Sequence, residues 1–166
     1  MNPDKLLILL ADDDIDDCLF FKEALEELDL SAELTTVHDG EQLMLHLTAK
    51  MDEPPHVLFL DLNMPRKNGL TCLDEIKGNV KLKALPVIIF STSFDEHVAD
   101  KLIENGAVYY ICKPTNFFQL KQVIFKALTL IKQSSEVAAL LSNAEGLTAA
   151  LPKEKFLLHQ VKEIIL

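Results

Sequence analysis

The sequence predicts an α/β protein, a (βα)5 doubly wound parallel five-stranded sheet with a short C-terminal extension. Three observations predict this class. Short β-like runs alternate with amphipathic helical patterns along the chain. Four of the five runs are almost entirely apolar, as in central parallel strands that helices cover on both faces. Polar side chains follow several of these runs directly, where the ligand site of such a sheet lies.

The individual elements follow from local patterns. The five expected strands cover residues 5–11, 32–37, 56–61, 86–91 and 107–112. The helix after the first strand and the helix after the fifth show apolar residues at steps of three and four. Each therefore has an apolar face that we expect to pack against the sheet. The Asn105-Gly106 pair predicts the end of the fourth helix, because glycine accepts the left-handed conformation found there.

Length and composition favour one domain. A chain of 166 residues with 49% hydrophobic content builds one well-packed core and a modest extension. We expect a domain over residues 1–132, with the fifth helix ending near Lys132. Residues 133–166 are expected to form an extension with at most one short helix, which is too little for a DNA-binding output domain.

Charge and cysteine usage exclude several functions. The formal net charge of -10 repels phosphate backbones and anionic membranes, so neither nucleic acid nor a membrane is an expected partner. Cys18, Cys72 and Cys112 lack paired spacing, which is typical of reduced thiols in a cytoplasmic protein. The apolar run near the N-terminus is too short for a signal peptide or a membrane span. We therefore expect a cytoplasmic location.

The ends of the expected strands carry the candidate site: Asp12 and Asp13 after the first, Asp61 at the third, Ser91 at the fourth and Lys113 after the fifth. Clustered carboxylates need a neutralising cation, and oxygen ligands favour Mg²⁺. A hydroxyl and an ammonium are suitable donors to phosphoryl oxygens. Asp61 stands alone at the end of the central apolar strand and is the best candidate for a nucleophile.

The other acidic residues near the first strand have a simpler interpretation. Asp14, Asp16 and Asp17 come where the first helix begins, so we expect them to cap it and to favour its positive end. The five histidines lack the spacing of metal ligands and are expected on the surface or in packing.

Four segments, in order and each at a strand end, resemble the receiver domain of two-component response regulators. They are residues 9–14 (LLADDD), 61–69 (DLNMPRKNG), 86–91 (PVIIFS) and the Lys113-Pro114 pair. The resemblance spans roughly the first 130 residues, judged by motif order. It implies a flavodoxin-like fold with strand order 2-1-3-4-5. It also implies a stand-alone, chemotaxis-regulator-like response regulator.

The resemblance further implies that Asp61 accepts a phosphoryl group from a sensor histidine kinase or a histidine phosphotransfer protein. Asp13 and Asp61 would bind Mg²⁺ through their side chains, Asp12 directly or through water, and Asn63 through its backbone carbonyl. The protein is then a phosphoacceptor module that catalyses only its own phosphorylation and dephosphorylation.

A switch is implied in the same way. Lys113 would offset charge on the phosphoryl oxygens, Ser91 would close on the phosphoryl group, and Tyr110 would turn inward. Serine stands at position 91 where threonine is commoner in the family. The altered surface of the fourth helix, fifth strand and fifth helix would contact a downstream protein. That surface, or the C-terminal extension, is also where a homodimer would form.

Three alternatives stay open. A phosphatase or phosphotransferase of the haloacid-dehalogenase type also uses an aspartyl nucleophile, but it carries a second aspartate where this chain has Asn63. A flavin- or nucleotide-binding flavodoxin-like protein is disfavoured because the five glycines form no phosphate loop and the chain has no tryptophan. A receiver that has lost phosphorylation is disfavoured by the intact site residues.

Overall fold

The computed structural model of the protein describes residues 5–143, with side chains described through residue 136. Its strands are β1 (Leu6–Ala11), β2 (Ala32–Val37), β3 (Val57–Leu60), β4 (Val87–Ser91) and β5 (Tyr109–Cys112). Its helices are α1 (Ile15–Glu26), α2 (Gly40–Ala49), α3 (Gly69–Gly78), α4 (Glu96–Glu104) and α5 (Phe117–Asn143). Each strand lies within its predicted range.

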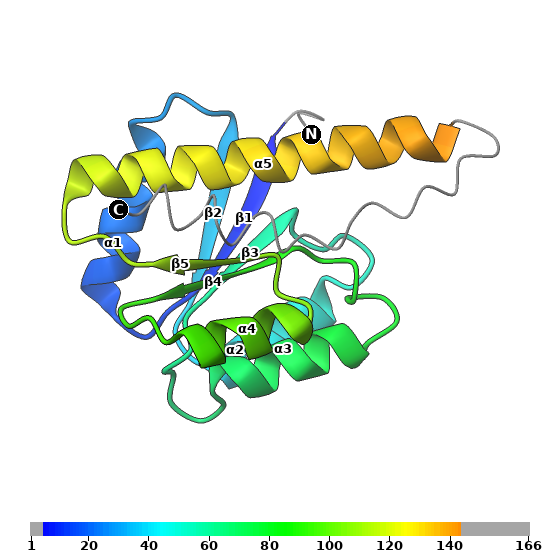
Figure 1. The fold of residues 1–166 in the computed structure, drawn as a ribbon, viewed down its shortest axis with the longest axis horizontal. Coiled ribbons are helices and arrows are strands. Elements are labelled where there is room, and N and C mark those ends of the chain that lie inside the picture. Colours follow the sequence, from blue (N-terminus) through cyan, green and yellow to red (C-terminus); the bar gives the residue numbers. More distant parts are fainter. Residues whose placement is uncertain (1–4, 144–166) are drawn as a thin grey trace.

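The strands form one parallel sheet in the order β2-β1-β3-β4-β5, as predicted. Helices α1 and α5 cover one face, and α2, α3 and α4 cover the other (Figure 1). The core is therefore divided into two layers by the sheet. Along β1, Ile8 and Leu10 contribute to the layer beneath α1 and α5, while Leu9 and Ala11 contribute to the opposite layer. This arrangement explains why the strand is apolar at every position.

Three phenylalanines form the centre of the layer beneath α1 and α5. Phe21 of α1 contacts Phe59 and Phe90 edge to face, with ring centroids 4.9 and 5.7 Å apart, and all three rings are buried. They lie close to the strand ends, so they support the edge of the sheet that carries the polar residues.

The helix ends agree with local signals. Asp14 caps α1, since its carboxylate accepts from the backbone N–H groups of Asp16 and Asp17. The predicted capping role of Asp14 is therefore confirmed. Gly106, directly after α4 and its C-cap Asn105, has a φ of +107°, a conformation that disfavours other residues.

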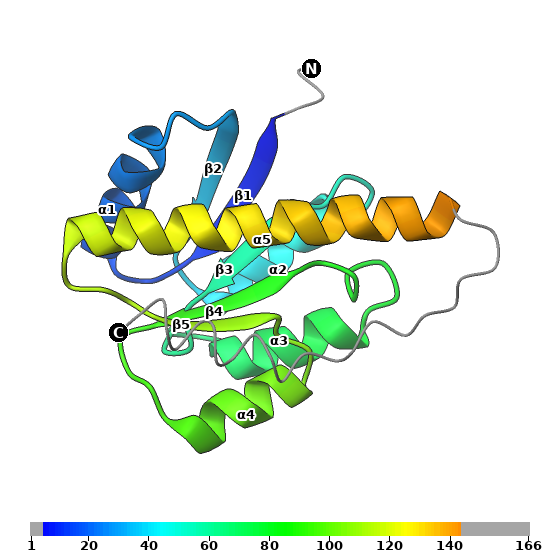
Figure 2. The same cartoon turned by 45° about the horizontal axis from the view of Figure 1, so that its top comes forward.

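The prediction that α5 ends near Lys132 is wrong, because the helix continues to Asn143 (Figure 2). The polar stretch over residues 133–136 contains neither glycine nor proline to break it. Ser135 keeps helical geometry while its hydroxyl donates to the carbonyl of Ile131. The short helix expected near the C-terminus lies outside the described residues, and the division at residue 132 stays a prediction.

Within residues 5–143, no helix is both long enough and apolar enough to cross a membrane.

Candidate functional site

The parallel sheet brings the predicted site residues to one edge. In the strand register Ala11 pairs with Leu60, and Ser91 pairs with Cys112. The residues that directly follow these strands, including Asp12, Asp61 and Lys113, therefore meet. The Lys113 ammonium lies 2.6 Å from Asp12 Oδ2 and 3.8 Å from Asp61 Oδ2. The contact with Asp12 has the distance of an ion pair although its angles are not those of a hydrogen bond.

Three carboxylates form a cluster that could hold a cation. One oxygen each from Asp12, Asp13 and Asp61 lies within 4.8 Å of the other two. Asp12 and Asp61 are buried, whereas Asp13 is exposed to solvent. The donors are all carboxylate oxygens, which suit a hard divalent ion such as Mg²⁺ or Mn²⁺. Asn63 follows in the β3–α3 loop, and its role as a carbonyl ligand stays a prediction.

Burial makes the negative charges of this cluster costly. It raises the pKa of Asp61 to about 6, and the nearby Asp12 charge adds to this effect while Lys113 opposes it. Burial also raises the pKa of Asp12, against the ion pair with Lys113. For Lys113 burial acts to lower the pKa, but the Asp12 and Asp17 carboxylates outweigh it and raise the value. A second cation at this edge would relieve the remaining charge.

Ser91 has an unused hydrogen-bonding group. Its side chain is completely buried, and its Oγ has no partner in hydrogen-bonding geometry within the described part of the chain. A buried hydroxyl without a partner costs roughly 1–3 kcal/mol. The hydroxyl is therefore available to a ligand that reaches the carboxyl end of β4.

Tyr110 is buried and turned toward the protein interior. Its hydroxyl donates to the carbonyl of Ser93 at 2.5 Å, and its ring meets Phe94 edge to face. Burial raises the pKa of Tyr110, and the neighbouring Ser91 hydroxyl acts in the opposite direction. Because the phenol proton is directed to Ser93, it does not satisfy Ser91.

The loop after Asp61 is tightly packed against the site. A Cβ atom on Gly69 would lie 2.3 Å from the Asp61 carbonyl oxygen, so only glycine fits. The Gly69 N–H donates to the Leu62 carbonyl, and Asn68 caps α3 through the N–H of Thr71. The beginning of α3 therefore fixes the backbone around Asp61.

Asp17 belongs to the site, although the sequence pattern gave it only a helix-terminal role. Lys113 Nζ donates to Asp17 Oδ2 at 2.8 Å. Helical spacing gave no signal for this role, because Asp17 lies in α1 whereas Asp13 precedes the N-cap Asp14.

The side chains of His38 and Cys18 contact the backbone of Asp12, and no pattern in the sequence predicted this contact. His38 Nδ1 lies 3.1 Å and Cys18 Sγ 3.5 Å from the backbone carbonyl oxygen of Asp12. The Asp12 N–H donates to the carbonyl of Val37. The Asp12 peptide is thus held on both sides, which fixes the carboxylate it carries.

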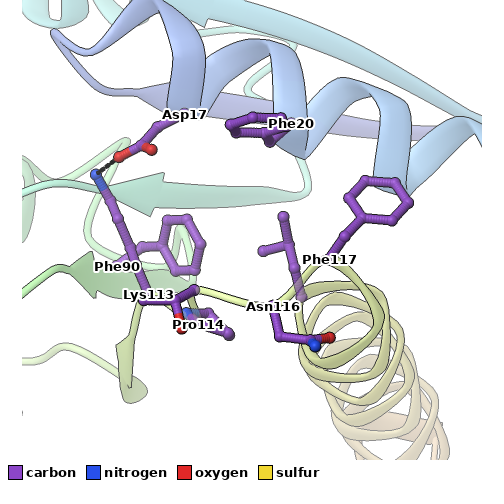
Figure 3. Close-up of a pocket in the computed structure, with 9 residues that line it drawn as sticks. Asp17, Phe20, Phe90, Lys113, Pro114, Asn116 and Phe117 are labelled. Atoms are coloured by element: carbon purple, nitrogen blue, oxygen red, sulfur yellow. Dashed lines mark hydrogen bonds and ion pairs between the residues drawn. The ribbon is translucent and has the colours of Figure 1, made fainter.

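A small cavity of about 90 Å³ lies beside Lys113, between α1 and the beginning of α5 (Figure 3). It is lined by Asp17, Phe20, Phe90, Lys113, Pro114, Thr115, Asn116, Phe117 and Leu120. Pockets for cofactor-sized molecules usually enclose about 300–1,000 Å³. This cavity is too small for a flavin.

Comparison with known proteins identifies the family of this chain. The family model that describes the response regulator receiver domain matches residues 8–125 of this chain. The chain belongs to the response regulator receiver family. Members are phosphoacceptor modules of two-component signalling, so the resemblance seen in the motifs is confirmed. The phosphatase and flavodoxin alternatives lose support accordingly.

Individual relatives agree with the family. The response regulator Rcp1 of Synechocystis sp. is 32% identical over 126 residues, which cover 74% of this chain and 83% of Rcp1. A structure of the Mn²⁺-bound form of Rcp1 aligns with a TM-score of 0.65 at 32% identity, over 72% of this chain and 88% of that one. The phosphorylated cyanobacterial phytochrome response regulator RcpA aligns with a TM-score of 0.67 at 33% identity, over 72% and 89% of the two chains.

Proposed function

We propose that the protein is a response regulator that accepts a phosphoryl group on Asp61 from a sensor histidine kinase or a histidine phosphotransfer protein. The observation that carries the proposal is the cluster of three carboxylates beside a single buried lysine at the edge of a receiver sheet. A negatively charged phosphoryl group can approach such a cluster only where cations neutralise it.

Asp61 is a better nucleophile than Asp12 on the same geometry. Both oxygens of Asp12 are engaged, because Oδ1 accepts from the N–H of Asp14 and Oδ2 lies 2.6 Å from Lys113. Asp61 Oδ2 is 3.8 Å from the same ammonium, beyond hydrogen-bonding distance. The lysine therefore holds Asp61 less tightly than Asp12, although the backbone N–H groups of Leu62 and Asn63 also interact with the Asp61 carboxylate. Its attack on phosphorus forms the acyl phosphate while the P–N bond breaks and the donor imidazole leaves with the electron pair.

Asp12, Asp13, Asp61 and the Asn63 carbonyl would hold Mg²⁺. The fit rests on the three oxygens within 4.8 Å of one another and on the charge that burial leaves uncompensated. When bound, the ion supplies positive charge to the phosphoryl oxygens. The existence of an Mn²⁺-bound form of the relative Rcp1 supports the binding of a divalent ion by this chain.

Lys113 and Ser91 would stabilise the phosphorylated form. The ammonium offsets charge on the phosphoryl oxygens, and the orphaned Ser91 hydroxyl donates to one of them. Satisfying that buried hydroxyl favours the state in which β4 closes on the phosphoryl group. Tyr110 already occupies an inward position and links this movement to the surface of α4, β5 and α5.

That surface is the proposed contact for a downstream protein. Phe94, Val98, Val108 and Phe125 are exposed apolar residues on or beside its elements. A homodimer through the same surface or through the C-terminal extension is the competing arrangement. Because RcpA is a phytochrome response regulator, a phytochrome-type kinase is the first donor to test. A cytoplasmic location agrees with the free thiols of Cys18, Cys72 and Cys112.

The decisive experiment is intact mass measurement after incubation with a small acyl-phosphate donor, with Mg²⁺ or with EDTA. Wild type is expected to gain one phosphoryl group only with Mg²⁺, and Asp61→Asn is expected to gain none. The adduct should decay over time in the absence of donor, through self-catalysed dephosphorylation. Lys113→Ala is expected to be phosphorylated without the accompanying conformational shift, and a normal shift in it would contradict the role of Lys113.

If no adduct forms, beryllofluoride binding separates the two possible explanations. Wild type that shows no adduct but binds beryllofluoride in the presence of Mg²⁺ would have a short-lived acyl phosphate, in agreement with the proposal. Wild type that gains no adduct and binds no beryllofluoride would be an interaction module without phosphorylation, and the proposed function would be wrong.

A further inference from the structure

Two carboxylates compete for the Lys113 ammonium before any phosphoryl group arrives. Nζ lies 2.6 Å from Asp12 Oδ2 and 2.8 Å from Asp17 Oδ2, and the lysine side chain is only 8% exposed. Figure 3 shows the ammonium turned toward the Asp17 carboxylate on α1. The distance to Asp61 Oδ2 is 3.8 Å, too long for a hydrogen bond. In this structure Asp12 and Asp17 therefore hold the lysine, and its contact with Asp61 is only a longer ion pair.

The two partners differ in how readily they release the lysine. Asp12 is completely buried, so a carboxylate there without its cation would be costly. The Asp17 side chain is 32% exposed, and water can solvate it when the ammonium moves. A phosphoryl group on Asp61 would therefore displace Asp17 more easily than Asp12.

We infer that Asp17 is a positioning residue that holds Lys113 in a resting orientation and competes with the phosphoryl group for its ammonium. This inference rests on the proposed function of Asp61. Asp17 lowers the availability of Lys113 and so opposes formation of the phosphorylated state. Loss of its carboxylate leaves the lysine free to contact a phosphoryl oxygen.

The sequence offers a matched control in the neighbouring Asp16. Both residues lie in the first turn of α1, where a carboxylate interacts favourably with the positive end of the helix. Asp16 is exposed and forms no ion pair in the part of the chain with described side chains. Asp16→Asn therefore removes the same charge from the same helical turn but leaves Lys113 unaffected. Asp14 caps the helix in either variant, so both are expected to fold.

The test compares wild type, Asp17→Asn, Asp16→Asn and Asp17→Glu in the full chain with Mg²⁺. The measured quantities are the initial rate of phosphorylation by a small acyl phosphate and the affinity for beryllofluoride, with thermal unfolding as a check of folding. Asp17→Asn is expected to raise both quantities by roughly three- to tenfold, as loss of one competing hydrogen bond of ordinary net strength predicts. Asp16→Asn is expected to match wild type, and Asp17→Glu to return toward wild type.

The outcomes separate the two proposals. Wild type that forms neither adduct nor beryllofluoride complex would overturn the function of Asp61 itself. An adduct that forms at the wild-type rate or more slowly in Asp17→Asn would overturn only the competing role of Asp17. Equal increases in Asp16→Asn and Asp17→Asn would also overturn it, because the effect would then come from general charge and not from Lys113.

Discussion

Replacing Asp61 by asparagine is expected to stabilise the protein in metal-free buffer. Burial raises the pKa of Asp61 from its usual 3.8 to about 6, so the folded protein binds this proton more tightly than the unfolded chain does. Ionising the carboxyl therefore costs folding free energy. The cost is absent well below pH 3.8, grows between pH 3.8 and 6, and is complete above pH 6. Asparagine has similar shape and carries no charge.

The magnitude follows from the pKa change. A rise from 3.8 to about 6, at about 1.4 kcal/mol per pH unit, corresponds to about 3 kcal/mol at pH 7.5. The nearby Lys113 charge is already included, because it lowers the pKa of Asp61. At pH 4.5 the same two pKa values give a folding cost of about 1 kcal/mol for ionising Asp61. For a chain of this length, 3 kcal/mol corresponds to a rise in Tm of roughly 6–12 °C.

The assay is thermal unfolding followed by circular dichroism in EDTA at pH 7.5 and pH 4.5. Asp100→Asn is the control, because it removes a carboxylate from an exposed position of α4. The Tm of Asp61→Asn should clearly exceed that of wild type at pH 7.5, and by much less at pH 4.5. The Tm of the control should differ little from that of wild type at either pH. A variant no more stable than wild type at pH 7.5, or one with the same advantage at both pH values, would refute the reasoning.

Three further predictions follow from the geometry of the site and the core. Mg²⁺ should raise the Tm of wild type but have a much smaller effect on Asp13→Asn, since that variant lacks one of the three clustered carboxylates; calorimetry of the two proteins with and without the ion checks this. Gly69→Ala should strongly destabilise the protein because its Cβ would lie 2.3 Å from the Asp61 carbonyl oxygen, whereas Gly78→Ala, with open space around the same atom, should have little effect or stabilise α3. Phe21→Ala should cost about 3–5 kcal/mol in urea unfolding because it empties the centre of an aromatic cluster, and Val80→Ala, at an 81% exposed side chain, should change little.

Much of the fold could be predicted from the sequence because its signals are local. The apolar run over residues 57–60 has the length of a strand buried on both faces, and the structure places a strand there. Asp14 could be predicted as a helix cap since it acts on backbone groups two and three residues away. The end of α5 was predicted wrongly because residues 133–136 are polar but still compatible with a helix.

The candidate site could be predicted only in part. Placing Asp12, Asp61 and Ser91 at strand ends was enough to predict that they lie at one edge of the sheet, because parallel strands share one carboxyl edge. The partner of Lys113 on α1 was missed, since Asp17 is 96 residues away in the chain. Which of several acidic residues a lysine contacts depends on how α1 packs against the sheet.

By itself the sequence determined the alternation of strands and helices, the polar residues at the strand ends and the order of the receiver motifs. These properties depend on the periodicity and composition of short segments. Only the tertiary structure decided that Lys113 is directed to Asp12 and Asp17, that Ser91 lacks a partner, and that burial raises the pKa of Asp61. Those properties depend on distances and solvent exclusion between distant segments, which arise only when the helices pack on the sheet.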